Sequence, residues 1–456
     1  MQDHAQAASL LIEGILDSLP ERFANHKTDE LESFINQYYR KTPESDLSIA
    51  TPEDFGGAAI SHWQLLQRRQ PRQILIRVFN PRVEQHGWQS PHTVIELVTD
   101  DMPYLVNSVS MVITQSGFNI HLTVHPILQV ERNEDGSITS LANGSETKNS
   151  TQTGGVAESL VHFQIDRIVD EDRLAALQHK IESVIYQVTT VYEDGDTLLL
   201  QPQAMAEKLR QHDKLDKKST ASLELLEWLD SAHFRVFGSA EYSCEKPGAC
   251  YEGVEGTAFG LMRRDERFDT SRATHAHEAN TVFEEVTANA TFLTATDTSG
   301  KEGQPLITIG KANVRSPLNR PEALDVITYY NRDDLYSHTI VGLFTQNMNN
   351  RETNYIPLLK DKTQSVLTAS GLDAKAHDGK ALLDTMENLP RDMLFQADIP
   401  EILDIARGIV NLQERQRIKL FGSLSSGGMY YNCLVYIPRD NYGGEIRRRI
   451  QSILLA

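Results

Sequence analysis

Residues 92–130 read HTVIELVTDDMPYLVNSVSMVITQSGFNIHLTVHPILQV, and this stretch decides the fold of the first part of the chain. Residues 93–98 are rich in β-branched side chains and predict a strand. The segment 102–116 is apolar at helical spacing, and Gly117 stands where a helix C-cap is expected. Residues 119–130 alternate between two faces and predict a second, long strand. The stretch therefore predicts strand, helix and strand in direct succession.

The same pattern extends on both sides of this stretch. Residues 73–79 and 159–165 are further strand-like runs, and residues 170–191 carry the clearest apolar helical stripe in the chain. The polar residues 133–157, rich in Gly, Ser, Thr and Asn, predict a loop between two strands. The order of elements over 71–192 predicts an antiparallel sheet with two helices on one face, which is an α+β arrangement.

The chain before this sheet reads as helical. Residues 1–70 contain apolar side chains at helical spacing, interrupted by prolines. Thr51 and Pro52 have the character of an N-cap followed by proline in the first turn. The helix that they begin is expected to run to about Arg69, with Arg68 and Arg69 on its exposed side.

The chain after the sheet changes character several times. Residues 200–220 are polar and predict a linker between two units. Residues 221–335 combine a short helix with several strand-like runs, separated by a polar and poorly periodic stretch at 263–290. Residues 357–418 predict three helices, the first closed by Gly371.

The last forty or so residues predict a strand hairpin followed by one helix. Residues 418–421 and 431–436 are the strands, and Ser425-Ser426-Gly427-Gly428 is the turn. The helix begins near Tyr442. A strand pair with one helix cannot bury its own faces. We therefore expect the natural chain to continue past Ala456, so that this sequence is a piece of a longer protein.

Composition limits the classes of function. A chain of 456 residues suggests about three domains. The net charge of −19 and the pI near 5.2 disfavour binding to nucleic acid or to anionic membranes. Three cysteines give no disulfide framework and indicate a reducing compartment. The start lacks a basic region ahead of its apolar residues, and no apolar run is long enough to span a bilayer. These features predict a cytoplasmic protein.

Residues 92–130 resemble the ACT-domain pattern, in which a strand leads through an Asp-x-Pro loop into a helix and a second strand. They resemble more closely the start of the large NAD-specific glutamate dehydrogenases of bacteria. Further stretches similar to that family are LEWL at 226–229 with HF at 233–234, KANVRS at 311–316, HDGK at 377–380, LPRDMLFQ at 389–396 and YIPRD at 436–440. The resemblance covers nearly the whole chain from about residue 70.

The resemblance implies tandem ACT-like, ferredoxin-type modules with a PAS-like module and helical segments. The domains it implies are a helical segment at 1–70, a first ACT-like domain at 71–200, a PAS-like α+β domain at 221–335, a second ACT-like or helical domain at 336–416 and the start of a third, truncated ACT-like domain at 417–456. Family members are several times longer, and their dehydrogenase domain lies downstream.

The function implied by the resemblance is a non-catalytic regulatory and assembly region of an NAD-dependent glutamate dehydrogenase. The parent enzyme would use NAD, whereas this chain is expected to hold no cofactor and no catalytic residue. The implied partners are the downstream catalytic domain, further copies in a homo-oligomer and an amino-acid effector. An alternative is a free-standing amino-acid sensor built from ACT-like modules. A third hypothesis, a hydrolase, lacks a Gly-x-Ser-x-Gly elbow.

A candidate effector site lies where the first strand meets the helix. Asp100 and Asp101 could cap that helix at Met102 or Pro103. They could instead capture the ammonium group of an effector while the helix N-terminus takes its carboxylate. The candidate effector-binding residues are Asp100, Asp101, Met102 and Asn107. Small-molecule-binding ACT domains usually have Gly after the loop proline, where this chain has Tyr104, a side chain that could fill the ligand's space.

Other motifs favour structural interpretations. No Gly-x-Gly-x-x-Gly fingerprint for NAD follows a strand. The glycines at 422–428 lack a P-loop lysine and are typical of a hairpin turn. The histidines 121, 125, 275 and 277 lack a complementary set of metal ligands, and Cys244 and Cys250 predict two free thiols. The pairs Arg391-Asp392 and Arg439-Asp440 could pin turns or lie at a subunit contact, and residues 311–313 could line a cleft.

Overall fold

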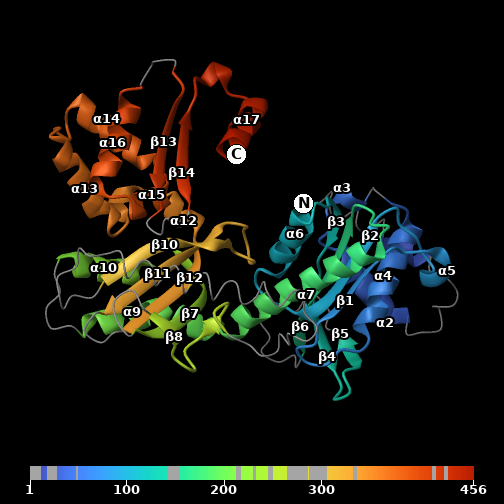
Figure 1. Cartoon of the computed structure of the whole chain (residues 1–456). Coiled ribbons are helices and arrows are strands. Elements are labelled where there is room, and N and C mark those ends of the chain that lie inside the picture. The colour runs from blue at the N-terminus through green and yellow to red at the C-terminus, as the bar shows by residue number, and fades with distance from the viewer. Residues whose placement is uncertain are drawn as a thin grey trace. The chain divides into compact units, whose positions relative to one another are not determined.

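The structure is a computed structural model of the chain. It describes residues 12–17, 28–47, 50–141, 155–211, 217–229, 233–244, 250–263, 286, 306–331, 336–412, 417–425 and 430–455. The chain divides into two compact units (Figure 1). Unit 1 comprises Met1–Tyr192 with Pro317–Pro321, and unit 2 comprises Glu193–Ser316 with Glu322–Ala456.

Unit 1 is built around one antiparallel sheet, as the sequence predicts. Its central strands are β2 (Thr93–Asp100) and β6 (Val156–Ile165), with β1 (Leu75–Phe79) pairing with the other edge of β2. The predicted long strand is divided into β3 (Ile120–Val124) and β4 (Ile127–Arg132), which both pair with β6. The division falls at Pro126, which has no N–H to donate to a ladder. The hairpin partner of β4 is β5 (Ile138–Leu141).

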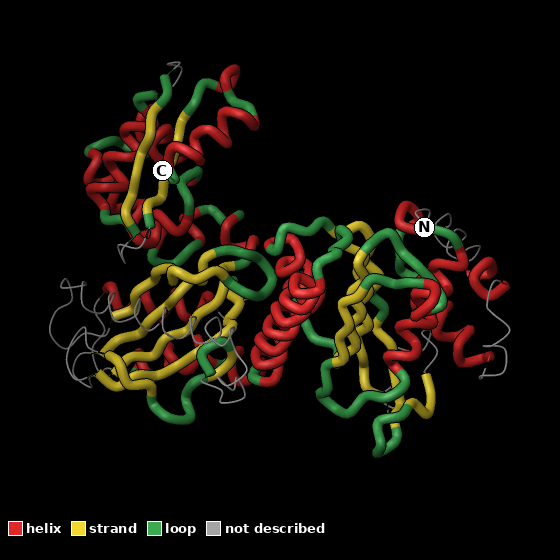
Figure 2. Tube along the Cα trace, turned by 45° about the vertical axis from the view of Figure 1, so that its right-hand side comes forward, coloured by secondary structure: helices red, strands yellow, loops and turns green. Residues whose placement is uncertain are grey.

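Helices cover both faces of this sheet. The helices α6 (Leu105–Gln115) and α7 (Glu171–Glu193) lie together on one face, as predicted, and α2 (Thr28–Tyr39) and α4 (Pro52–Leu66) lie on the other (Figures 1 and 2). The short helices α3 (Glu44–Leu47) and α5 (Val83–His86) complete this part. Because both faces are covered, β2 is buried along nearly its whole length.

The amino-terminal helices share one hydrophobic core with the sheet. Phe34 and Ile35 of α2 and Phe55 of α4 pack in the same cluster as Val98 of β2 and Leu160 of β6. Thr51 caps α4, as expected, by accepting a hydrogen bond from the Asp54 N–H at 3.3 Å. Unit 1 therefore contains the helical segment and the sheet in one compact body.

Unit 2 contains a second antiparallel sheet. Its order is β10 (Leu306–Arg315), β11 (Ala323–Asn331), β12 (Tyr336–Phe344), β7 (Phe234–Cys244) and β8 (Cys250–Gly253), with β9 (Phe259–Gly260) also pairing with β7. The predicted strands therefore form, whereas most of the polar stretch expected at 263–290 lies outside the described residues.

The expected linker at 200–220 is wrong in part. Residues Gln201–Arg210 form helix α9, flanked by α8 (Gly195–Leu199) and α10 (Lys217–Leu229). Met205 and Leu209 of α9 are fully buried in the main core of unit 2. Together with Ala206, these two apolar side chains at helical spacing within a polar run pack the segment into this core.

The remainder of unit 2 is a helical layer followed by a hairpin. The layer consists of α12 (Gln346–Asn349), η2 (Thr353–Tyr355), α13 (Leu359–Ser370), α14 (His377–Glu387), α15 (Arg391–Gln396) and α16 (Ile399–Val410). The hairpin is β13 (Lys419–Leu424) with β14 (Tyr431–Tyr436), followed by η3 (Arg439–Asn441) and α17 (Gly444–Leu454). The hairpin predicted from the sequence is therefore present. In the part of the chain described here, no helix has the length and apolar character needed to cross a membrane.

Candidate functional site

The candidate effector residues follow strand β2, but the helix start differs from the expected one. Helix α6 begins at Leu105, and its N-cap is Tyr104, with φ of 69° and no capping hydrogen bond from its side chain. The N-cap interpretation of Asp100 and Asp101 is therefore wrong. A positive φ is unusual for a non-glycine residue, and it places Tyr104 in the conformation that glycine adopts freely.

The two aspartates are held by different partners. Asp100 accepts a hydrogen bond from the Arg69 guanidinium at 2.5 Å, and its side chain is 30% exposed. The Asp101 carboxylate accepts a bond from the Ser159 hydroxyl at 2.6 Å, and Ser159 is also 3.2 Å from the His125 ring. Met102 is buried and Asn107 is exposed. The structure thus ties both carboxylates to neighbouring elements.

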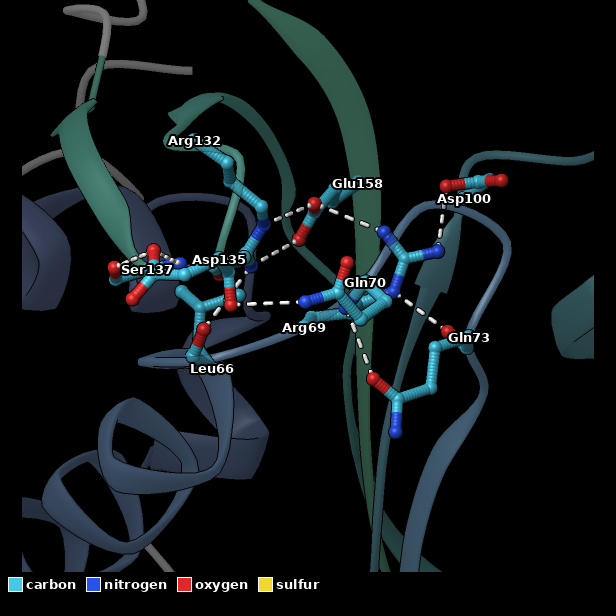
Figure 3. A network of polar contacts seen from close by, with 10 residues as sticks. Leu66, Arg69, Gln70, Gln73, Asp100, Arg132, Asp135, Ser137 and Glu158 are labelled. Carbon is cyan, nitrogen blue, oxygen red and sulfur yellow. Dashed lines mark hydrogen bonds and ion pairs between the residues drawn. The ribbon is translucent and has the colours of Figure 1, made fainter.

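Arg69 is the centre of a buried polar network, shown in Figure 3. Although the sequence pattern predicts an exposed helix face for Arg69, this residue is only 1% exposed. Its guanidinium donates to the Glu158 carboxylate at 2.9 Å, to Asp100 and to the Gln73 carbonyl at 2.7 Å. A cation this deeply buried is tolerated because carboxylates and a carbonyl accept its N–H groups.

Arg132 completes the network from the end of β4. It donates to both oxygens of Glu158 at 2.7 Å, which is the bidentate geometry that suits a guanidinium and a carboxylate. It also donates to the carbonyl of Gly136 at 2.7 Å and to that of Leu66 at 3.0 Å. Glu158 alone would leave one of the two guanidinium charges without a balancing carboxylate. Asp100 supplies the second negative charge.

This arrangement joins four pieces of unit 1. Leu66 is the last residue of α4, Gly136 lies in the β4–β5 turn, Glu158 is on β6 and Asp100 ends β2. Among the described residues, the acceptors for the Arg69 and Arg132 side chains are carboxylates and backbone carbonyls. Its evident chemistry is charge pairing that fastens the amino-terminal helices to the sheet.

A second buried cluster lies between α4 and the sheet. Glu96 of β2 pairs with Arg77 of β1 and is 4.0 Å from the His162 ring of β6. His62 of α4 lies 2.8 Å from the Tyr38 hydroxyl and 3.1 Å from a carbonyl of β2. Burial raises the pKa of Glu96, partly offset by Arg77, and lowers the pKa of His162 to about 3. Burial also lowers the pKa of His62 well below its usual range. Both histidines are therefore neutral at pH 7.

A third cluster lies in unit 2 and involves two motifs singled out in the sequence. The Lys311 ammonium is 2.8 Å from Asp325 and 3.1 Å from Asp392 of α15. Burial raises the pKa of Asp325 to about 6, although Lys311 lowers it. Burial lowers the pKa of Lys311, but the two aspartates outweigh that effect and raise it. Lys311 thus joins the sheet to the helical layer.

The arginine of the 391–392 pair pins a turn, which was one of the two interpretations. Arg391 donates to the carbonyls of Glu387 at 3.0 Å and Arg351 at 2.9 Å, and to the Glu387 carboxylate at 3.2 Å. Arg439 and Asp440 lie in η3.

The structure describes two of the four histidines singled out in the sequence, His121 and His125. His121 is 2.7 Å from Asp166, and the described residues contain no group of three or more side chains suited to a metal ion. His275 and His277 lie outside the described residues. Cys433 is a free, exposed thiol. Cys244 and Cys250 face each other in the β7–β8 ladder, but their side chains lie outside the described part.

Sequence reasoning missed Arg69, Arg132 and Glu158. The one local signal is Glu158, which stands at the start of an apolar strand run. A charged residue that is buried there needs a partner of opposite charge. Arg69 and Glu158 are 89 residues apart, so the sequence alone cannot pair them.

Family models of glutamate dehydrogenases match three parts of the chain in order. The model described as "Glutamate dehydrogenase, ACT1 domain" matches residues 34–181. The model described as "Glutamate dehydrogenase, helical motif 1" matches 356–415, and "Glutamate dehydrogenase, ACT2 domain" matches 419–456. The first match contains the sheet of unit 1 and the polar network, and the third contains the hairpin and α17.

Three similar proteins are each described as an NAD-specific glutamate dehydrogenase. The protein of Halomonas elongata is 29% identical over 97% of this chain and 27% of its own length. That of Pseudomonas aeruginosa is 30% identical over 96% of this chain and 26% of its own length. That of Mycobacterium tuberculosis is 23% identical over 90% of this chain and 23% of its own length. The chain spans about a quarter of the length of these relatives.

Proposed function

We propose, from the premise that this chain belongs with the amino-terminal region of the NAD-specific glutamate dehydrogenases, that it is a regulatory and assembly region without catalytic residues of its own. The whole protein would convert L-glutamate, NAD and water to 2-oxoglutarate, ammonia and NADH in the cytoplasm. NAD would bind to a catalytic domain downstream in the same chain.

One observation carries this proposal. Two ACT domains and a helical motif of glutamate dehydrogenases match the chain in order, and its relatives align with almost all of it. Those relatives are nearly four times as long as the aligned part. ACT-like sheets with helices on their faces supply surfaces for binding and packing, whereas a dinucleotide site needs a glycine-rich turn between a strand and a helix.

The central sheet of unit 2 supports the proposal of a PAS-like module at 221–335, although the last strand of this sheet, β12 (Tyr336–Phe344), lies just beyond those bounds, in the range proposed for the second ACT-like or helical domain. The first strand of that sheet, β7, lies between its second strand, β8, and its last strand, β12. This placement of the first strand inside an antiparallel sheet is the arrangement expected of a PAS-like fold. The helices α9 and α10 pack against the same sheet through the main core of unit 2.

We also propose that an amino-acid effector binds at the start of α6, through Asp100, Asp101, Met102 and Asn107. Two features support this site. The Asp100 carboxylate is partly exposed, and the side chain of the N-cap residue forms no capping hydrogen bond with α6, whose first N–H groups suit a carboxylate. Tyr104 is the feature that limits the size of such a ligand.

The assembly role rests on apolar side chains at the last elements of the chain. Leu420, Leu424 and Tyr431 of the hairpin and Ile453 and Leu454 of α17 are more than one-third exposed. Exposed apolar patches of this kind mark interaction surfaces. We propose that the whole protein is a homo-oligomer in which this region makes contacts. Analytical ultracentrifugation at tens of micromolar should show weak self-association of the chain, whereas a strict monomer would contradict this role.

The catalytic part of the proposal is tested by comparing this chain with the whole protein encoded by its native gene. The whole protein should form NADH from glutamate and NAD, whereas the chain should form none. Calorimetric titration of the chain with NAD should give no saturable heat. A native reading frame that encodes no further domain, together with amino-acid binding by the chain, would favour the alternative of a free-standing sensor.

A further inference from the structure

We infer that the Arg69–Asp100 ion pair couples the candidate effector loop to the amino-terminal helices. An α-amino acid whose ammonium group takes the Asp100 carboxylate would deprive Arg69 of a partner and loosen α4 from the sheet. This inference rests on the proposed effector site, and it adds the route by which occupation of that site reaches another part of unit 1.

The side chains of the polar network differ in their exposure to solvent. The side chains of Arg69 and Glu158 are each 2% exposed, whereas that of Asp100 is 30% exposed. A dissolved ligand can therefore approach Asp100 without opening the network. Asp100 is also the residue that leads from β2 into the loop before α6. It therefore lies at the junction between this loop and the buried network.

Without Asp100, Arg69 would keep only two of its three acceptors. The remaining partners of the guanidinium are Glu158 and the Gln73 carbonyl, and Glu158 is already shared with Arg132. Two buried guanidiniums would then face one carboxylate. An uncompensated buried charge is strongly unfavourable, so Arg69 is expected to move toward solvent or toward a new acceptor.

The backbone of Arg69 is held against the β4–β5 turn, so Arg69 cannot move without moving that turn. Its backbone N–H donates to the Gly136 carbonyl at 2.9 Å, and the Ile138 N–H donates to the Gln67 carbonyl at 3.2 Å. A Cβ atom added to Gly136 would lie 2.6 Å from the Arg69 carbonyl oxygen, so the two backbones are in close contact. Arg69 also follows α4 by three residues. A shift of Arg69 is therefore transmitted to the β4–β5 turn and to the end of α4.

Hydrogen–deuterium exchange of the whole chain tests the coupling without a ligand. Asp100→Asn should accelerate exchange of amides in α4 and in residues 133–137 by about tenfold or more, as expected for loss of a charge-assisted bond. Asp166→Asn is the matched control, because its carboxylate is similarly exposed, at 37%, and bonds to Asn119 and His121 and not to Arg69. It should leave exchange of α4 near the wild-type rate. If Asp100→Asn leaves α4 unchanged, the coupling is overturned.

The ligand arm uses an equimolar mixture of the common L-α-amino acids, with their Nα-acetyl derivatives as the control that lacks the α-ammonium group. The free amino acids should accelerate exchange of α4 in the wild type and not in Asp100→Asn. Binding of the amino acids, seen by calorimetry, without any change at α4 would overturn the coupling and leave the effector site standing. If the amino acids neither bind nor change the exchange of α4, the proposed effector site is wrong. The competition for Asp100 is then wrong as well, even if Asp100→Asn shows faster exchange.

Discussion

The two regions matched to ACT domains present the same local order of elements in very different surroundings. In unit 1, strands β1 and β2, with the short helix α5 between them, are followed by α6, and in residues 419–456 strands β13 and β14 are followed by η3 and α17. Five residues of α6 are buried, whereas the described residues of α17 include no buried one. The strand β2 is buried almost throughout, and β14 is not. A hydrophobic pattern therefore produces the helix in both places, but only a sheet with further strands and a second layer buries it.

The polar network offers the most severe test of this contrast. Glu158→Gln keeps the shape of the side chain and removes the charge that two buried guanidiniums share. We expect unit 1 to lose about 3–5 kcal/mol of stability, the range found when one partner of a buried ion pair is removed. The matched change Glu445→Gln alters an exposed residue of α17 and should shift stability by no more than about 0.5 kcal/mol. Hydrogen exchange in each region, monitored as urea is increased, measures the stability change caused by each of the two substitutions. Equal effects would mean that the network does not stabilise unit 1.

The packing of the two helices can be compared with one pair of substitutions. Ile113 of α6 is fully buried, and Ile453 of α17 is 65% exposed. Ile113→Ala should destabilise unit 1 by about 2–4 kcal/mol through lost contacts and a cavity, and Ile453→Ala should change stability by less than about 0.5 kcal/mol. Denaturant unfolding of both variants provides the measurement. A large cost at Ile453 would show that α17 is covered in solution, for example by a second copy.

Local signals in the sequence were sufficient for most elements and insufficient for the network. The strand, helix and strand of 92–130 follow from residue periodicity, which needs no knowledge of distant partners. Arg69 was misplaced because its partners, Asp100 and Glu158, are 31 and 89 residues away. The start of α6 was misjudged for a related reason, since tertiary contacts engage the two aspartates that would otherwise cap it. The candidate effector residues remain a prediction.

Acid should distinguish the two regions as well. His62 and His162 are buried in unit 1 with lowered pKa values, and residues 419–456 contain no histidine. Between the unfolded pKa of about 6.5 and the lower folded values, the unfolded chain binds protons that unit 1 does not. The stabilising effect of the neutral histidines is therefore complete above pH 6.5 and decreases as the pH falls, by about 1.4 kcal/mol per pH unit for each histidine.

Chemical unfolding of unit 1 at pH 7 and at pH 5.5 measures this dependence. His162→Gln should flatten it in part, because His62 and His125, whose pKa values are also lowered by burial, remain. Hydrogen exchange in residues 419–456, corrected for the intrinsic effect of pH, serves as the internal comparison. A pH dependence that is identical in the wild type and in His162→Gln would contradict the assignment of a low pKa to His162.

The smallest effect concerns the residue that precedes each helix. Tyr104 precedes α6 with φ of 69°, and Gly443 precedes α17 in an extended conformation with φ of −156°. Tyr104→Ala and Tyr104→Gly both remove the side chain, so the difference between them isolates the backbone. The glycine variant should be more stable by about 1 kcal/mol, because only glycine adopts a positive φ without strain. Gly443→Ala should change stability by no more than about 0.5 kcal/mol, because extended backbone suits any residue and no other group lies within 4 Å of the added Cβ. Denaturant unfolding of the three variants gives the comparison. If the two Tyr104 variants are equally stable, the left-handed conformation of residue 104 carries no strain. The absence of glycine at that position would then matter only through the space that the Tyr104 side chain occupies.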